Sequence, residues 1–212
     1  MKETGILMTA ENALAILESR KTQTRRVIKE QPLSGRSIKH YSDNEWVVYS
    51  DSDPIVNVYT IKCPYGQVGD RLWVRETFTV TNHGTPVYKA GCNIMSGLKI
   101  DPNDVSWTPS IHMPRWASRI TLEITGVRAE RVQDIAPEDC LAEGIVIPPC
   151  PMIATASPIL FGDKVDTALD VLNDCFKRDS FKVLWDSINA KRGHPWEKND
   201  WVWAIEFKVA NH

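Results

Sequence analysis

A short segment near the amino terminus holds the side chains best suited to chemistry. Residues 19–26 read Ser-Arg-Lys-Thr-Gln-Thr-Arg-Arg, so four of the eight side chains are cationic. Grouped Lys and Arg side chains create a local positive potential that attracts phosphate or carboxylate groups. Thr22 and Thr24 lie between these cations and supply hydrogen-bonding hydroxyls and a candidate nucleophile. The segment is therefore the first candidate for a ligand site.

Lys21 and Thr24 stand three residues apart within this segment. They would share a face if the preceding helix continued through them, and Lys21 could also reach Thr24 across a turn. A lysine whose pKa is lowered can take a proton from a hydroxyl. A solvated helix end is the simpler interpretation, and the motif taken alone favours it.

A second candidate, Glu76, lies on a strongly alternating segment over residues 71–80. Leu72, Val74 and Phe78 share its face, so its carboxylate stands in line with three apolar side chains. Such a carboxylate loses hydration unless it is paired. A lysine–glutamate pair in a cleft would supply an acid and a base. The sequence alone favours a salt bridge with an arginine, or exposure at the end of the strand.

The elements that must position these residues follow from periodicity and capping. A helix is expected over 10–20 with Thr9 as its N-cap, which would place Arg20 and Lys21 in its last turn. Two more helices are expected, one from Pro137 to about Gly144 and one over 173–190. Strands are expected at 6–8, 24–28, 46–49, 58–61, 71–80, 119–125 and 201–209, with a bulge at Gly126. This pattern indicates an α+β fold with a mostly antiparallel, curved or barrel-like sheet.

Composition limits the class of protein. The chain has 212 residues and is 42% hydrophobic, which suits one large domain with a packed core. The net charge is −2 and the sequence pI is about 6.2. This balance argues against nonspecific coating of nucleic acid but allows a small specific site.

Cysteine and histidine usage gives no sign of a metal site. The five cysteines are odd in number and lack C-x-x-C spacing, which argues against a disulfide framework and a zinc site and suits a cytoplasmic protein. His83, His112 and His194 also lack ligand-like spacing. We expect no metal and no cofactor. We expect no signal peptide and no membrane partner, because the chain lacks a long apolar run.

Several segments resemble the ASCH domain family. Residues 19–26 resemble its signature G-x-K-x-x-[ET]-x-R, with Lys21, Thr24 and Arg26 in the matching positions and Ser19 in place of the glycine. The segment 73–78, Trp-Val-Arg-Glu-Thr-Phe, looks like the second signature of the family, and the strand at 201–209 also suits it. The segment 111–119, Ile-His-Met-Pro-Arg-Trp-Ala-Ser-Arg, is similar to ASCH-like proteins of phages and prophages of enteric bacteria.

The resemblance implies a PUA-like curved, mostly antiparallel β-barrel with about three helices at its rim. It implies a single domain over 1–212 with insertions near 29–57 and 145–172, which make the chain considerably longer than the compact amidohydrolases of the family. Its expected partner is a nucleoside or RNA.

One branch of the family hydrolyses N4-acetylcytidine to cytidine and acetate. By that resemblance Thr24 would be the nucleophile, and Lys21 and Glu76 would transfer protons. Other branches imply a metal-independent ribonuclease or an RNA-binding module without catalysis, and these alternatives stay open. The side chains expected to contact substrate or RNA are Arg20, Arg25, Arg26, Arg75, Arg115, Trp116 and Arg119. Trp116 also has the simpler interpretation of packing before a core strand.

Overall fold

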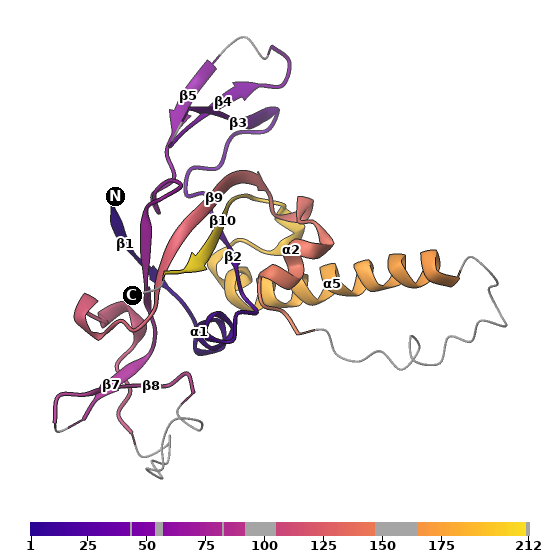
Figure 1. Cartoon of the computed structure of the whole chain (residues 1–212). Helices are drawn as coiled ribbons and strands as arrows, with labels where there is room; N and C mark the ends of the chain where they lie inside the picture. Colours follow the sequence, from indigo (N-terminus) through magenta and orange to yellow (C-terminus); the bar gives the residue numbers. More distant parts are fainter. Residues whose placement is uncertain (43, 54–56, 82, 92–104, 147–164, 211–212) are drawn as a thin grey trace.

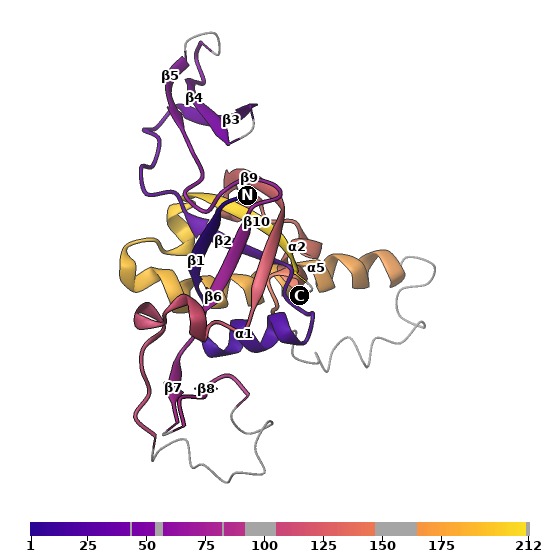
Figure 2. The ribbon, with the colours of Figure 1, turned by 60° about the vertical axis from the view of Figure 1, so that its left-hand side comes forward.

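A five-stranded sheet forms the centre of the molecule (Figures 1 and 2). The computed structural model describes residues 1–42, 44–53, 57–81, 83–91, 105–146 and 165–210. The strands run in the order β1-β6-β9-β10-β2. They are β1 (Glu3–Leu7), β2 (Gln23–Val27), β6 (Arg71–Arg75), β9 (Thr121–Arg131) and β10 (Trp201–Val209). The β1–β6 pair is parallel, and the other pairs in this sheet are antiparallel.

Three α-helices are present in the described part of the chain. Helix α1 (Ala10–Leu17) connects β1 to β2, and α2 (Pro137–Ala142) follows β9. Helix α5 (Val165–Asn189) packs against α2 and leads into the 3-10 turn η5 (Ala190–Arg192). The contact between the helices is apolar and includes Cys140, Phe181 and Trp185. The expectation of an α+β fold with mostly antiparallel sheets and about three helices is confirmed.

Two small sheets extend from opposite ends of the central sheet (Figure 1). One contains β3 (Arg36–Ser42), β4 (Glu45–Ser50) and β5 (Asn57–Ile61) and covers most of the insertion expected near 29–57. The Trp46 ring contacts the Trp203 ring at 4.7 Å between centroids, which joins this sheet to the core. The other contains β7 (Phe78–Val80) and β8 (Pro86–Tyr88).

The core follows the alternation of the sequence. On one face of β10 the buried residues are Trp201, Trp203, Ile205 and Phe207. On the other face Val202 and Ala204 are also buried, and Val202 belongs to the apolar cluster of α2 and α5. The register between β9 and β10 shifts between Glu206 and Phe207, opposite Gly126, where the sequence predicted a bulge. Strand β10 is therefore an inner strand that is buried on both faces over residues 201–205, and it supports β2 and the site.

Some element boundaries differ from the sequence predictions. The first helix ends at Leu17 rather than at residue 20, and the strand expected over 71–80 ends at Arg75 before β7 begins. The helix expected over 173–190 begins at Val165. Strand β3 was not predicted, because its exposed polar residues show no apolar alternation. Residues 147–164, which make up most of the second expected insertion, lie outside the described residues.

The expected barrel is not closed by hydrogen bonds in the described residues. Strands β1 and β2 are the two edges of the central sheet, and no ladder joins them. Instead, the Arg26 Nη2 atom of β2 donates a hydrogen bond of 2.6 Å to the main-chain oxygen of Leu7 in β1. A side chain therefore bridges the two edges where a strand ladder would close a barrel.

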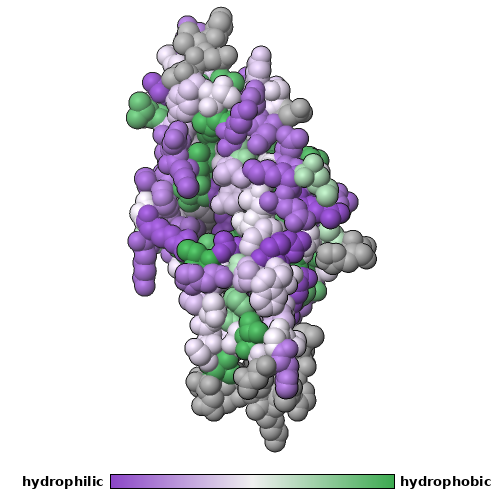
Figure 3. Space-filling view, turned by 90° about the vertical axis from the view of Figure 1, so that its left-hand side faces the viewer, coloured by the Kyte–Doolittle hydropathy of each residue, from purple (hydrophilic) through white to green (hydrophobic). Residues whose placement is uncertain are grey.

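The surface on the left of Figure 1 consists mainly of hydrophilic side chains, with hydrophobic ones in small separate patches (Figure 3). None of the described helices is both long enough and apolar enough to span a membrane.

Candidate functional site

The end of α1 determines where Lys21 lies. Ser19 adopts a left-handed conformation with φ of 58°, and its N–H donates to the Ile16 carbonyl at 3.0 Å. The N–H of Arg20 donates to the Ala15 carbonyl at 2.8 Å, which completes a Schellman motif. Because the helix stops there, Lys21 lies beyond the helix end and pairs in an isolated bridge with Glu143.

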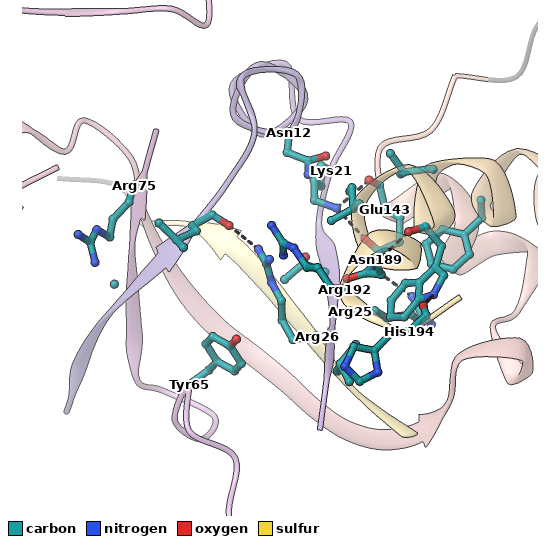
Figure 4. A pocket seen from close by; sticks show the side chains of 18 residues that line it. Asn12, Lys21, Arg25, Arg26, Tyr65, Arg75, Glu143, Asn189, Arg192 and His194 are labelled. Atoms are coloured by element: carbon teal, nitrogen blue, oxygen red, sulfur yellow. Dashed lines mark hydrogen bonds and ion pairs between the residues drawn. The ribbon is translucent and has the colours of Figure 1, made fainter. Parts of the chain in front are cut away.

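A cavity of about 440 Å³ opens between the two edge strands of the central sheet (Figure 4). Gly5 and Leu7 of β1 line one side, and residues 24–27 of β2 line another. The end of α5 and the turn after it supply further walls. Other residues that line this cavity are Asn12, Lys21, Tyr65, Arg75, Glu143, Phe181, Leu184, Trp185, Ile188, Asn189, Arg192 and His194.

A buried ion pair forms part of the cavity wall. The Lys21 Nζ atom lies 2.7 Å from Glu143 Oε2 and also donates to the Glu143 main-chain oxygen at 2.7 Å. The two side chains are only 1% and 5% exposed. Burial lowers the pKa of Lys21 below its ordinary value, although the Glu143 carboxylate opposes this shift. At a given pH, a larger fraction of Lys21 is therefore in the neutral amine form than for an exposed lysine.

Arg25 also touches the cavity, but carboxylates hold its guanidinium. It forms ion pairs with Glu130 at 2.6 Å, Asp139 at 2.9 Å and Glu143 at 3.1 Å. Burial disfavours its charge, but Glu143 and Glu130 outweigh this cost and raise the pKa of Arg25. Arg25 therefore joins β2 to α2 and to β9, and its charge is already neutralised within the fold.

Glu76 does not line this cavity. It is 1% exposed, and its two carboxylate oxygens accept hydrogen bonds of 2.9 Å from Nε and Nη2 of Arg119. Arg119 also donates to the Ala90 carbonyl and lies 4.0 Å from the centre of the Tyr88 ring. This is the arginine pairing that the sequence favoured. Of the three expected catalytic residues, the structure brings Lys21 and Thr24 into one cavity, and Glu76 lies elsewhere.

The other expected contact residues divide into two groups. Arg26 and Arg75 line the cavity with Arg25. Arg20, Arg115 and Trp116 do not line it, and neither does Arg119. Arg20 pairs with Glu18, Arg115 pairs with Glu3 at 3.1 Å, and Trp116 is 64% exposed on the 3-10 turn η2 (Arg115–Ala117).

Sequence reasoning did not identify several residues of the cavity. Glu143 is 122 positions from Lys21 in the chain, and no local pattern connects the two. Tyr65 comes from a turn, and Arg192 comes from η5, which follows α5. His194 lines the cavity with its Nδ1 atom 2.6 Å from the buried Asp200 carboxylate. The sequence had considered this histidine only as a metal ligand.

Within the described residues, no group of His, Cys, Asp and Glu side chains could hold a metal ion. No family model, no curated protein and no solved structure matches this chain.

Proposed function

We propose that this chain is a nucleoside- or RNA-directed protein of the ASCH type, with a PUA-like fold, and that its cavity hydrolyses the N4-acyl amide of a cytidine. One observation carries the proposal. Lys21 and Thr24, two positions of the ASCH signature, line the same cavity beside a buried Lys21–Glu143 pair. A cavity of about 440 Å³ has the size of a small-molecule site, which favours a single nucleoside over an extended RNA track.

The proposed reaction uses Thr24 as the nucleophile. Its Oγ1 atom attacks the acyl carbonyl carbon while the neutral amine of Lys21 takes the hydroxyl proton. The bond between the acyl carbon and N4 then breaks, and the Lys21 ammonium gives the proton to the leaving nitrogen, which releases cytidine. Water attacks the acyl-threonine ester and gives its proton to Lys21. The ester bond breaks, Thr24 regains a proton, and the carboxylic acid leaves.

The carboxylate of the site is assigned to Glu143. The resemblance to the ASCH family gave this role to Glu76, but Arg119 holds both carboxylate oxygens of Glu76. Glu143 is in direct contact with Lys21 Nζ. It therefore orients the amine and stabilises its protonated form between the two proton transfers.

The test is release of cytidine from N4-acetylcytidine, followed by chromatography. Thr24→Val should lower the rate by at least about 100-fold, because it removes the nucleophile. Thr22→Val is the matched control. It changes an exposed threonine two residues away that does not line the cavity, and it should keep the wild-type rate. Absence of turnover by the wild type, or full activity of Thr24→Val, would refute the hydrolase assignment.

An RNA-binding role without catalysis is the second candidate. It is favoured by three arginines that line the cavity and form no ion pair within the described residues, namely Arg26, Arg75 and Arg192. Binding to structured RNA in a gel shift should then weaken steeply as salt rises, because phosphate contacts release counterions. Binding that is absent, or that does not change with salt, would reject this candidate.

A further inference from the structure

Arg26 is a cation of the cavity without a carboxylate partner. Its Nη2 atom donates to the Leu7 carbonyl, while its Nε atom is buried and has no hydrogen-bond partner. No ion pair joins Arg26 to any carboxylate in the described residues, whereas its neighbour Arg25 has three. Burial lowers the pKa of Arg26, although nearby Tyr65 and the Glu143 carboxylate oppose this shift.

A second guanidinium lies beside that of Arg26. Arg192, at the end of η5, lines the same cavity, and the two side chains lie close together in Figure 4. The charge of Arg192 lowers the pKa of Arg26 further, so the two groups repel each other. Arg192 also forms no ion pair within the described part of the chain. Arg75 lies on the far side of the cavity in Figure 4, with its guanidinium directed away from this pair.

We infer that the ligand of this cavity carries a phosphate group and that Arg26 and Arg192 bind it together. Two unpaired guanidinium groups in a partly enclosed space repel each other, and an anion between them removes that repulsion. Guanidinium groups match phosphate oxygens by paired N–H donors, and a phosphate monoester has enough charge to neutralise both. The Glu143 carboxylate does not compete with the phosphate for Arg26 and Arg192, because Lys21 and Arg25 already hold it.

The position of this pair also suits a nucleotide. Thr24 and Arg26 are two residues apart on β2, so they stand about 7 Å apart along the strand. Tyr65 also lines the cavity, near Arg26, and offers an aromatic ring to a base. The assignment of a cytidine base rests on the proposed function. The inference adds that the ligand is a nucleotide, either free or at the end of an RNA.

The inference is tested by calorimetric titration with cytidine, cytidine 5′-monophosphate and inorganic phosphate. The monophosphate should bind at least tenfold more tightly than cytidine, and phosphate should compete with it. Arg192→Gln should remove most of this advantage without changing cytidine binding, and because Arg192 is exposed the variant should fold. Lys191→Gln, which removes the adjacent exposed cation outside the cavity, should keep the advantage.

A short RNA with and without a 5′-phosphate separates the two sources of the group. Tighter binding of the phosphorylated RNA than of the free monophosphate would assign the site to an RNA end, and the reverse would assign it to a free nucleotide. The inference is overturned if the monophosphate binds no more tightly than cytidine, or if Arg192→Gln weakens both ligands equally. Turnover of N4-acetylcytidine without a phosphate advantage would overturn this inference alone. A phosphate advantage without turnover would overturn only the hydrolysis.

Discussion

Glu143→Gln provides the most direct test of the buried charge arrangement beneath the cavity. The substitution leaves an amide oxygen as an acceptor for Arg25, but it removes the carboxylate that lies 2.7 Å from Lys21 Nζ. Lys21 then keeps only the main-chain carbonyl of residue 143 as an acceptor. Breaking a buried pair costs about 3–5 kcal/mol, and the acceptors that remain place this variant near the lower end, at about 3 kcal/mol. For a chain of this size, that loss lowers the melting temperature by about 6–12 °C.

The loss of stability caused by Glu143→Gln should depend on pH in a defined direction. Without Glu143 the pKa of Lys21 falls further below its ordinary value of 10.5. Between the folded pKa and 10.5, the unfolded chain binds one more proton than the folded chain, so stability rises with pH. The variant enters this range at a lower pH than the wild type does. Its deficit in stability should therefore shrink as the pH rises from 7 towards 10.

The assay is urea unfolding followed by tryptophan fluorescence at several pH values. Adding Lys21→Met to Glu143→Gln should recover part of the loss, because it removes the uncompensated cation. Glu197→Gln is the matched control. It breaks an exposed pair with Lys182 and should leave the unfolding midpoint unchanged. A loss below about 1 kcal/mol, or a deficit that does not vary with pH, would refute the reasoning.

Two further predictions concern the end of α1 and the cysteines. Ser19→Gly should raise the free energy of unfolding by about 0.5–1 kcal/mol. Glycine relieves the left-handed strain at φ 58°, and this gain exceeds the cost of the entropy that glycine adds to the unfolded chain. An unchanged or lower midpoint in urea would contradict this prediction. Burial raises the pKa of the Cys63 thiol to about 11, whereas Cys175 is exposed. Iodoacetamide at pH 8 should therefore alkylate Cys175 in the native protein long before Cys63, as read by peptide mass mapping, and equal rates would show that Cys63 is accessible.

The local part of this molecule could be predicted from its sequence. Thr9 caps the first helix, and its hydroxyl accepts from the Asn12 N–H at 3.2 Å. The alternation in 201–209 predicted the strand and the burial of Trp201 and Trp203, and Pro137 marks the first position of α2. These features follow from helix capping, from the period of the apolar residues and from the geometry of the proline ring. Each involves only a few neighbouring residues, so no distant contact was needed to predict them.

The end of the first helix shows where local reasoning fails. Periodicity allowed the helix to continue to residue 20, but the Schellman turn at Ser19 ended it at Leu17. A serine in a left-handed conformation has no strong signal in sequence, since the intrinsic preference of the residue is against it. The packing of the segment after Ser19, with Lys21 bridged to Glu143, determines the turn.

Local patterns in the sequence predicted the α+β class, the strand over 201–209 and the cationic segment that contains Lys21 and Thr24. Which carboxylate meets Lys21 depends on the packing of distant elements, because Glu143 and Glu76 are both remote from Lys21 in the chain. In the folded chain Glu76 forms an ion pair with Arg119, and Glu143 forms one with Lys21. A buried charge requires a partner, and that partner is the side chain that strand and helix packing bring within hydrogen-bond distance.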